Sequence, residues 1–408
     1  MNVLQVNYTD LPGKRFNGYD LNIALRRDGI DAKQIVLNKY TDIEEHTVSS
    51  LKQDLVLHEL YRWVEDKYSV SNVLYPYGKQ FMESADFKGA DIIHYHILHR
   101  FMFSLFDYPE LMNGRNVVWT IHDPWIITGN CVYPLNCKNW KTGCIECKRL
   151  KENGFEMRYN HTSEMWKIKE TVLKQINPHI IVSSHFMEQY IEKSPITKHF
   201  NKIHKIPFGI NVEDFQLEHR SLKRKQHKIE KDEIVIGFRS DANPVKGCSY
   251  IYEALRNLDD KEKIVLATVG TENIPSDIEK KYKVQNFGWI NGKEQISNYL
   301  LICDIFLMPS LAESFGLMAI EAMAAETPVV CFKGTTVEGI IGGTMCGLPV
   351  DYRSSEALAK AIYFLSTNQK VRIKMGKEGR KRVCKHYLFE DYVYRHKKLY
   401  YEILSNQI

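Results

Sequence analysis

Short runs of apolar residues, rich in valine and isoleucine, alternate along the chain with longer segments of helical periodicity. Continuous apolar strands that are separated by helices are typical of parallel sheets covered on both faces. The pattern therefore predicts an α/β fold. The predicted strands are 2–6, 35–37, 92–95, 117–121, 180–183, 203–208, 234–238, 264–269, 305–308 and 328–331, and the predicted helices between them include 19–28, 316–325 and 355–366.

The alternating pattern stops near residue 208 and starts again near residue 234. The segment from Glu213 to Lys231 is charged and contains no glycine, as expected for a connection. A chain of 408 residues is also too long for one core, because domains usually hold about 100–200 residues. The sequence therefore predicts two α/β domains. Ligand sites in open parallel sheets form beyond the carboxyl ends of the strands, so motifs that directly follow strands are candidates for function.

Composition excludes several classes of protein. Hydrophobic residues make up 44% and charged residues 26% of the chain, which excludes wholesale disorder and collagen-like repeats. No apolar run approaches the roughly 18–20 residues that cross a bilayer. The first residues lack the basic and apolar segments of a secretory signal, so we expect a cytoplasmic protein. A net charge of +5 does not indicate a nucleic-acid binder.

The basic residues are clustered in two runs. Residues 220–231 hold six lysines and arginines against one glutamate, and residues 372–385 hold seven against one. Runs of charge usually form solvated surfaces. The alternative is attraction to an anionic substrate or to anionic lipid, which would place the protein peripherally at the inner face of the membrane. The sequence does not choose between the two.

The stretch 308–324 carries the strongest functional signal. A predicted strand ends there and a helix begins, so free N–H groups at the helix start can hold a phosphate, and the helix dipole favours its charge. Glu313 precedes this helix and Glu321 lies inside it. Their carboxylates suit sugar hydroxyls, because one carboxylate can accept two hydroxyl protons. The alternative interpretation is a favourable acid at a helix start together with a solvated glutamate.

A second motif follows the strand 234–238. Arg239 and Lys246 place two cations in one predicted loop. A departing pyrophosphate needs its negative charge stabilised, and these cations can supply that without a metal. Ordinary loop charge is the alternative. The chain contains no P-loop, no Gly-x-Gly-x-x-Gly after the first strand and no Asp-x-Asp, which argues against sites of those types.

Histidines follow two strands of the first half. His94 and His96 come with one strand and His122 follows the next. A lone histidine is usually structural, but a histidine just beyond a strand end lies at the edge where ligands bind. We expect a functional contact from His122, and a structural role for the other two remains the simpler interpretation.

Four cysteines fall within seventeen residues of one another, at Cys131, Cys137, Cys144 and Cys147. The closely spaced second pair has good spacing for a tetrahedral zinc, and the first pair is more loosely spaced. Four thiolates would leave no open position, so such a zinc would be structural. Four reduced thiols in a long loop are an equally good interpretation, whereas a disulfide framework is improbable without an export signal.

The motifs together resemble the family 4 retaining glycosyltransferases of the GT-B fold. The resemblance rests on the glutamate pair, on the loop that holds Arg239 and Lys246, and on residues 206–211. The region 119–147 resembles the branch that builds bacterial capsule, exopolysaccharide and O-antigen chains. The resemblance implies two Rossmann-like domains whose parallel sheets face each other across a cleft. It also implies that the last helix returns to the first domain, which gives an acceptor domain of 1–210 with 389–408 and a nucleotide-sugar domain of 211–388.

The resemblance also implies roles for single residues. Glu321 would bind the nucleotide ribose and Glu313 the donor sugar, while His122 would lie at the reacting centre. Arg239 and Lys246 would hold the pyrophosphate. The remaining residues implied to bind the nucleotide sugar are Gly18, Gly209, Ser314, Phe315, Gly316 and Leu317, of which Phe315, Gly316 and Leu317 would act through backbone N–H groups. One departure is that the loop after the first strand has only Gly13 and Gly18 where the family usually has adjacent glycines.

The function implied is transfer of a sugar, of the hexosyl type and with retention, from a nucleotide diphosphate sugar to a hydroxyl of a glycan or a lipid-linked saccharide. No cofactor is expected for catalysis, and the route favoured is front-face attack in which a phosphate oxygen of the leaving group takes the proton. One alternative is a sugar-nucleotide epimerase of GT-B architecture. The other is a non-enzymatic protein that binds zinc or nucleic acid. The sequence does not distinguish UDP, GDP and ADP donors.

Overall fold

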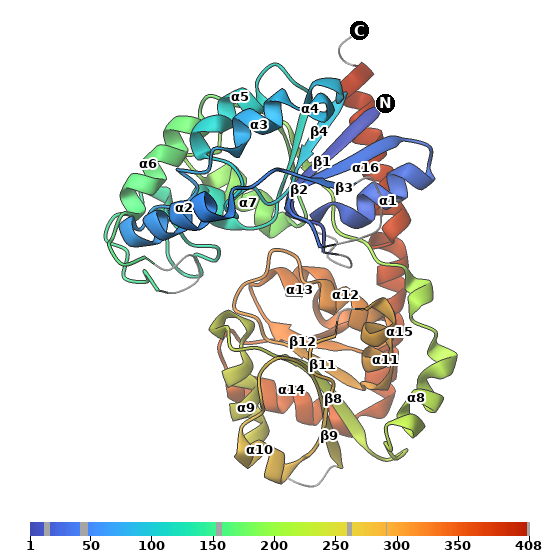
Figure 1. Cartoon of the computed structure of the whole chain (residues 1–408). Helices are drawn as coiled ribbons and strands as arrows, with labels where there is room; N and C mark the ends of the chain where they lie inside the picture. The colour runs from blue at the N-terminus through green and yellow to red at the C-terminus, as the bar shows by residue number, and fades with distance from the viewer. Residues whose placement is uncertain (12–16, 41–47, 152–156, 259–262, 291, 406–408) are drawn as a thin grey trace. The chain divides into compact units, whose positions relative to one another are not determined.

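The computed structural model describes residues 1–11, 17–40, 48–151, 157–258, 263–290 and 292–405. The chain divides into two compact units, one formed by residues 1–207 and 393–408 and the other by residues 208–392 (Figure 1). These boundaries lie a few residues from the expected ones. No helix among the described residues is both long enough and apolar enough to span a membrane.

The N-terminal unit is built on a seven-stranded sheet in which every described pairing is parallel. The strand order is β3-β2-β1-β4-β5-β6-β7, so the direction of the connections reverses between β1 and β4. The strands are β1 Asn2–Thr9, β2 Asp31–Asn38, β3 Val48–Ser50, β4 Ile92–Tyr95, β5 Val117–Ile121, β6 His179–Val182 and β7 Ile203–Lys205. The central strands are almost entirely buried, as their apolar sequences require.

Helices cover this sheet, and the last of them comes from the end of the chain. Helix α16 contacts the unit through Tyr400, whose hydroxyl lies near Gln5 of β1, and through an ion pair of 2.7 Å between Lys397 and Asp28 (Figure 1). Residues 393–408 thus belong to the N-terminal unit. The helices are α1 Tyr19–Arg27, α2 Leu55–Tyr68, α3 Tyr77–Glu83, α4 Ala85–Gly89, α5 Tyr108–Met112, α6 Thr162–Leu173, α7 His185–Lys193 and α16 Phe389–Ser405.

The C-terminal unit is built on a six-stranded sheet, again parallel in every described pairing. Its order is β10-β9-β8-β11-β12-β13, so the connections reverse between β8 and β11. The strands are β8 Ile234–Ser240, β9 Ile264–Gly270, β10 Lys283–Asn286, β11 Ile305–Met308, β12 Val329–Phe332 and β13 Gly347–Val350.

The helices of the C-terminal unit pack against this sheet around a core of isoleucine, leucine and phenylalanine side chains. The segment 213–231, which was expected to be a plain connection, contains helix α8. The helices are α8 Arg220–Gln226, α9 Cys248–Arg256, α10 Ser276–Lys281, α11 Lys293–Ile302, α12 Leu317–Ala324, α13 Thr336–Ile341, α14 Ser355–Thr367 and α15 Gln369–His386.

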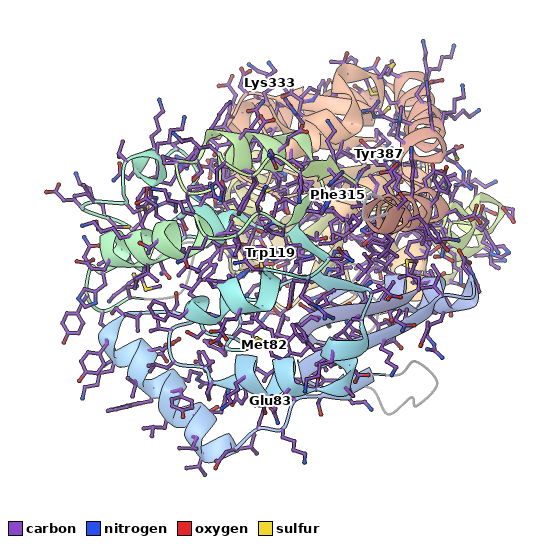
Figure 2. The ribbon with its side chains drawn as sticks, turned by 90° about the horizontal axis from the view of Figure 1, so that it is seen from above. Met82, Glu83, Trp119, Phe315, Lys333 and Tyr387 are labelled. Atoms are coloured by element: carbon purple, nitrogen blue, oxygen red, sulfur yellow. The ribbon has the colours of Figure 1, made fainter. Side chains whose placement is uncertain are left out.

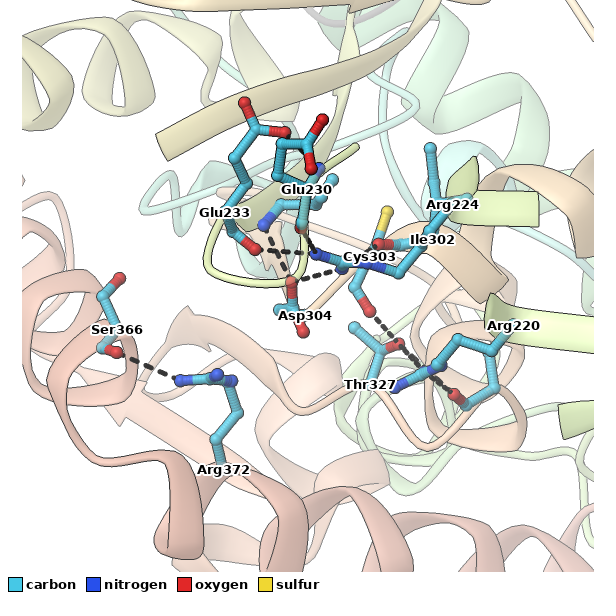
Figure 3. Close-up of polar contacts among 12 residues, drawn as sticks. Arg220, Arg224, Glu230, Glu233, Ile302, Cys303, Asp304, Thr327, Ser366 and Arg372 are labelled. Carbon is cyan, nitrogen blue, oxygen red and sulfur yellow. Dashed lines mark hydrogen bonds and ion pairs between the residues drawn. The ribbon is translucent and has the colours of Figure 1, made fainter. Parts of the chain in front are cut away.

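Five arginines of the two basic runs hold the carboxyl ends of helices α11 to α14. Figure 3 shows Arg220, Arg224 and Arg372. The last carbonyls of a helix have no partner inside it, and a cation there also complements the helix dipole. The charge runs are therefore structural in part, and their exposed charge is carried by lysines. The bonds run from Arg224 to Ile302 O, from Arg220 to Ala325 O, from Arg380 to Ala324 O, from Arg382 to Ile340 O and from Arg372 to Leu365 O and Ser366 O.

Replacing Arg224 with alanine is expected to lower the free energy of unfolding by about 3 kcal/mol, because a mostly buried charge network loses one partner. Arg224 Nη1 lies 2.7 Å from Asp304 Oδ2 and donates to Ile302 O, and its Nη2 donates to Glu233 O at 2.7 Å. Denaturant unfolding measures the loss. Lys225→Ala, which removes an exposed cation from the same helix, is the control and should change stability little. Equal stability of the two variants would contradict the structural role.

Candidate active site

Two loops of the C-terminal unit meet at the carboxyl ends of β8 and β11, the adjacent strands at which the connections reverse. Leu311 N donates to Val245 O at 2.7 Å and joins the loops directly. Gly247 has φ +78°, and a Cβ built there would lie 2.1 Å from Pro309 O. Only glycine permits this approach. The crevice beyond such a reversal point is where open α/β sheets bind ligands.

Lys246 and Glu313 form an ion pair across these two loops. Their Nζ and Oε1 atoms are 2.7 Å apart, and the side chains are 20% and 11% exposed. Ser310 Oγ donates to the same carboxylate oxygen at 3.1 Å. The backbone carbonyl of Glu313 accepts from Thr336 Oγ1, which ties the loop to the first turn of α13. The two predicted residues are therefore positioned as one unit.

Arg239 lies in β8, one residue before its end, and not in the loop as expected. Its Nη2 is 2.7 Å from Asp241 Oδ2, and its guanidinium lies 5.3 Å from the centre of the Trp289 ring. Its Nε is buried and has no hydrogen-bond partner in the described part of the chain. A buried donor without an acceptor is costly, so this atom is suited to an anionic ligand.

The loop after β11 leads into the amino end of α12. Gly316, which has no side chain that could cap the helix, precedes it with φ +107°. The Phe315 ring packs against Phe208 and Tyr387 at ring-centre distances of 5.4 and 5.9 Å. Figure 2 labels Phe315 and Tyr387. Phe315 can therefore offer a ligand only its backbone. Uncapped N–H groups and the positive end of the helix dipole suit a phosphate at Leu317.

The other predicted residues of this unit lie close to these loops in sequence or support them. Glu321 is on α12 and its side chain is 4% exposed. Ser314 is in the loop that leads to α12. A Cβ at Gly209 would lie 2.3 Å from Leu388 O, and Ile210 N donates to Tyr387 O, so Gly209 serves close packing of two backbone segments.

A row of imidazoles lies at the reversal point of the N-terminal sheet. His96 Nε2 is 2.7 Å from Gln5 Oε1 of β1, and His96 Nδ1 is 3.3 Å from His122 Nε2. His94 Nδ1 is 2.7 Å from Tyr400 Oη. Gly18 caps α1 with φ +81°, and a Cβ there would lie 2.5 Å from His96 Nε2, so the glycine allows the loop to approach this ring. Gly13 lies outside the described residues.

These histidines are neutral near pH 7. Burial lowers the pKa of His122 to about 3. Burial and the neighbouring imidazoles hold the pKa values of His94 and His96 well below the usual range. Burial opposes ionisation of Asp123, but His99, whose Nε2 lies 3.1 Å from its Oδ2, outweighs this and lowers the pKa of Asp123. The row can therefore act through hydrogen bonds of fixed direction, and a titration near neutral pH is not expected from it.

The four clustered cysteines lie near one another in the N-terminal unit. Burial, with smaller contributions from the neighbouring thiols, raises the pKa of Cys131 to about 12. Burial raises the pKa of Cys144 to about 11, and Gly129 N donates to its Sγ at 3.1 Å. Among the described residues, no three His, Cys, Asp or Glu side chains are arranged to hold a metal ion. The zinc interpretation for Cys131, Cys137, Cys144 and Cys147, and the alternative of four reduced thiols, both stay predictions.

Some residues of these two clusters were not singled out from the sequence. Asp241 stands two residues after Arg239, and an acid so close to a candidate cation was a usable signal. Gln5 is a polar residue in the middle of an apolar strand, which also could have been noticed. Trp289 is distant in sequence from Arg239 and carried no signal.

Comparison with known proteins identifies part of the chain. Residues 219–382 match the family model for glycosyl transferases group 1. The capsular polysaccharide biosynthesis glycosyltransferase CapM of Staphylococcus aureus is 30% identical over 216 residues, which are 50% of this chain and 56% of that protein. The chain thus spans about half the length of the first curated relatives that it matches. The residues that match the family model include Lys246 and Glu313.

Solved structures match the chain over its whole length. Sucrose-phosphate synthase from Thermosynechococcus elongatus has a TM-score of 0.70 at 18% identity, with all of both chains covered. HepE of Anabaena, solved with UDP-glucose, has a TM-score of 0.66 at 15% identity, also with full coverage. At such identities the likeness is one of fold. Residues 219–382 are a glycosyl transferases group 1 domain, carried by a chain with the two-domain GT-B fold.

Proposed function

We propose that the protein is a glycosyltransferase that moves a sugar from a nucleotide diphosphate sugar to a hydroxyl of a saccharide. The observation that carries this is the ion pair of Lys246 and Glu313 at the reversal point of a group 1 domain, with Arg239 near the end of β8 and Gly316 at the start of α12. Cations and helix N–H groups suit the diphosphate, and carboxylates suit sugar hydroxyls.

The proposed reaction needs little covalent chemistry from the protein. Lys246, Arg239 and the backbone at Phe315–Leu317 stabilise the charge that develops on the departing diphosphate, and Glu313 orients the sugar. A phosphate oxygen of the leaving group takes the proton of the attacking hydroxyl on the same face, which gives retention. His122 is proposed to contact the reacting sugar as a neutral hydrogen-bonding group.

Both cations already have carboxylate partners, so their charges are balanced before any donor binds. The incoming diphosphate therefore meets cations whose orientation is fixed, and fixed cations stabilise a transition state more than mobile ones. Glu313 has a second carboxylate oxygen besides the one that Lys246 contacts, and we propose that this oxygen accepts from the donor sugar. Glu321 is proposed to bind the ribose.

Relatives suggest the acceptor class. CapM is described as a capsular polysaccharide glycosyltransferase, TuaC of Bacillus subtilis as a putative teichuronic acid glycosyltransferase, and WaaG as a glycosyltransferase of lipopolysaccharide biosynthesis. We therefore propose a glycan or a lipid-linked saccharide of the cell surface as acceptor. Contact with an anionic membrane stays a prediction, and it would depend on exposed lysines of α8 and α15, because the arginines there hold helix ends.

Transfer is expected to continue in excess EDTA, because Arg239 and Lys246 supply the positive charge that a divalent cation would otherwise provide. Turnover before and after chelation is the measurement. Loss of activity that Mg²⁺ or Mn²⁺ restores would contradict the mechanism. Loss that only Zn²⁺ restores would support a structural zinc at the four cysteines.

Thermal unfolding in the presence of UDP-, GDP- and ADP-sugars tests the donor class. A ligand that binds only the folded state raises the unfolding temperature. One donor class is expected to stabilise the wild-type protein and to lose this effect in Lys246→Ala. The absence of stabilisation by every donor would contradict the proposed function.

A further inference from the structure

The side chain of Gln5 is fully buried in the middle of β1, between apolar neighbours. A buried amide must satisfy its donors and its acceptor separately. Gln5 Oε1 lies 2.7 Å from His96 Nε2, and Gln5 Nε2 donates to Tyr400 Oη at 3.3 Å. Each end of the amide therefore bonds a different ring.

The carbonyl end of this amide determines where the protons of two imidazoles lie. A carbonyl oxygen can only accept, so His96 Nε2 carries a hydrogen. His96 is neutral, because burial lowers its pKa, so its Nδ1 carries none and must accept from the atom that it contacts. That atom is His122 Nε2, at 3.3 Å. His122 Nε2 therefore carries the hydrogen, and Nδ1 of this neutral ring is the accepting nitrogen.

The NH₂ end of the Gln5 side chain is consistent with the same direction of hydrogen-bond donation along the row. Tyr400 Oη accepts from Gln5 Nε2 and can then give its own proton to His94 Nδ1, 2.7 Å away. His94 Nε2 would then donate to Thr120 Oγ1 at 2.7 Å. One orientation of the Gln5 amide thus fits all five contacts. Turning the amide over would reverse every proton in the row, which makes the direction measurable.

We propose that Gln5 and His96 are positioning residues that hold His122 as its Nε2–H tautomer, so that Nδ1 accepts a hydrogen bond from a hydroxyl of the sugar substrate. This rests on the proposed function of His122. The His122 side chain is partly exposed, whereas Gln5 and His96 are buried and act through it. A ring held in the other tautomer would present a donor to the same hydroxyl.

Nuclear magnetic resonance of ¹⁵N-histidine-labelled protein without ligand tests the direction of the row. His122→Asn identifies the His122 signals by their loss. In the wild-type protein, His122 is expected as the Nε2–H tautomer. Gln5→Met removes the acceptor at nearly the same side-chain length, and His122 should change to the Nδ1–H form or to a mixture.

Gln34→Met is the matched control, because Gln34 is the register partner of Gln5 on β2 and its Nε2 donates to Asn17 O, with no imidazole contact among the described residues. It should leave the His122 tautomer unchanged. If Gln5→Met does not fold, Tyr400→Phe removes the hydroxyl that orients the amide and should give both tautomers. His122 as Nδ1–H in the wild type, or unchanged in both Gln5→Met and Tyr400→Phe, would overturn the proposal.

A kinetic readout separates this proposal from the proposed function. Release of nucleoside diphosphate from the stabilising donor should fall at least about tenfold in kcat in Gln5→Met, with a smaller change in donor KM. An altered tautomer with unchanged kcat would overturn the sugar contact at Nδ1. The resonance experiment needs no substrate. Absence of sugar transfer would therefore contradict the proposed function without changing the tautomer result.

Discussion

Lys246→Ala is expected to lower kcat for sugar transfer by about 10²–10³-fold, the effect of removing one preorganised charge from a developing anion. Its Nζ is fixed against Glu313 at 2.7 Å, so the charge needs no rearrangement when the diphosphate departs. Steady-state release of nucleoside diphosphate measures the loss. The matched control is Lys263→Ala, which removes an exposed lysine paired with Asp232 at 2.6 Å, just before β8 and β9 begin.

The control should keep wild-type turnover, because ligands bind at the opposite, carboxyl ends of these strands. Unchanged turnover in Lys246→Ala would show that Lys246 does not bind the diphosphate. Because Lys246 and Glu313 are in direct contact, the double variant Lys246→Ala with Glu313→Gln should lose less activity than the product of the two single losses.

Substitutions at the two glutamates are expected to change different kinetic constants. Glu321→Gln keeps the side-chain shape but loses the charge that strengthens bonds to the ribose hydroxyls, so donor KM should rise and free nucleoside diphosphate should bind more weakly. Glu313→Gln should lower kcat more than it raises KM, because a misplaced sugar carbon reacts slowly. Calorimetry of the nucleoside diphosphate with each variant, together with steady-state kinetics, measures both effects.

Weaker nucleotide binding in Glu313→Gln with normal binding in Glu321→Gln would reverse the two assignments. Unchanged binding and rate in both would leave the motif without a function. Since Glu321 is almost fully buried, unfolding curves of both variants are needed to show that the substitutions leave the fold intact.

The sequence predicted the central strands well because burial on both faces gives an unbroken apolar run. The predicted bounds 92–95, 117–121 and 305–308 are those of β4, β5 and β11. The strands not predicted are β3, β10 and β13, and all three lie at sheet edges. An edge strand such as Lys283–Asn286 has one partner and an exposed side, so its residues need not be apolar.

The predicted site was partly recoverable from local sequence. Cations and acids that follow strands were recognisable, since parallel strands bring their carboxyl ends to one edge. The pairing of Lys246 with Glu313 could not be recognised from the sequence, because this contact depends on how Gly247 lets two loops approach each other. The runs of charge predict a solvated surface, because no local pattern shows which helix end a distant guanidinium reaches.

The most direct test of the account is the release of nucleoside diphosphate from UDP-, GDP- and ADP-sugars in EDTA, with and without saccharide acceptors. We expect one donor class to be consumed faster when an acceptor hydroxyl is present, with the sugar found on the acceptor. Consumption that no acceptor accelerates, with the sugar converted to its epimer, would contradict glycosyl transfer, as would the failure of every donor class to react.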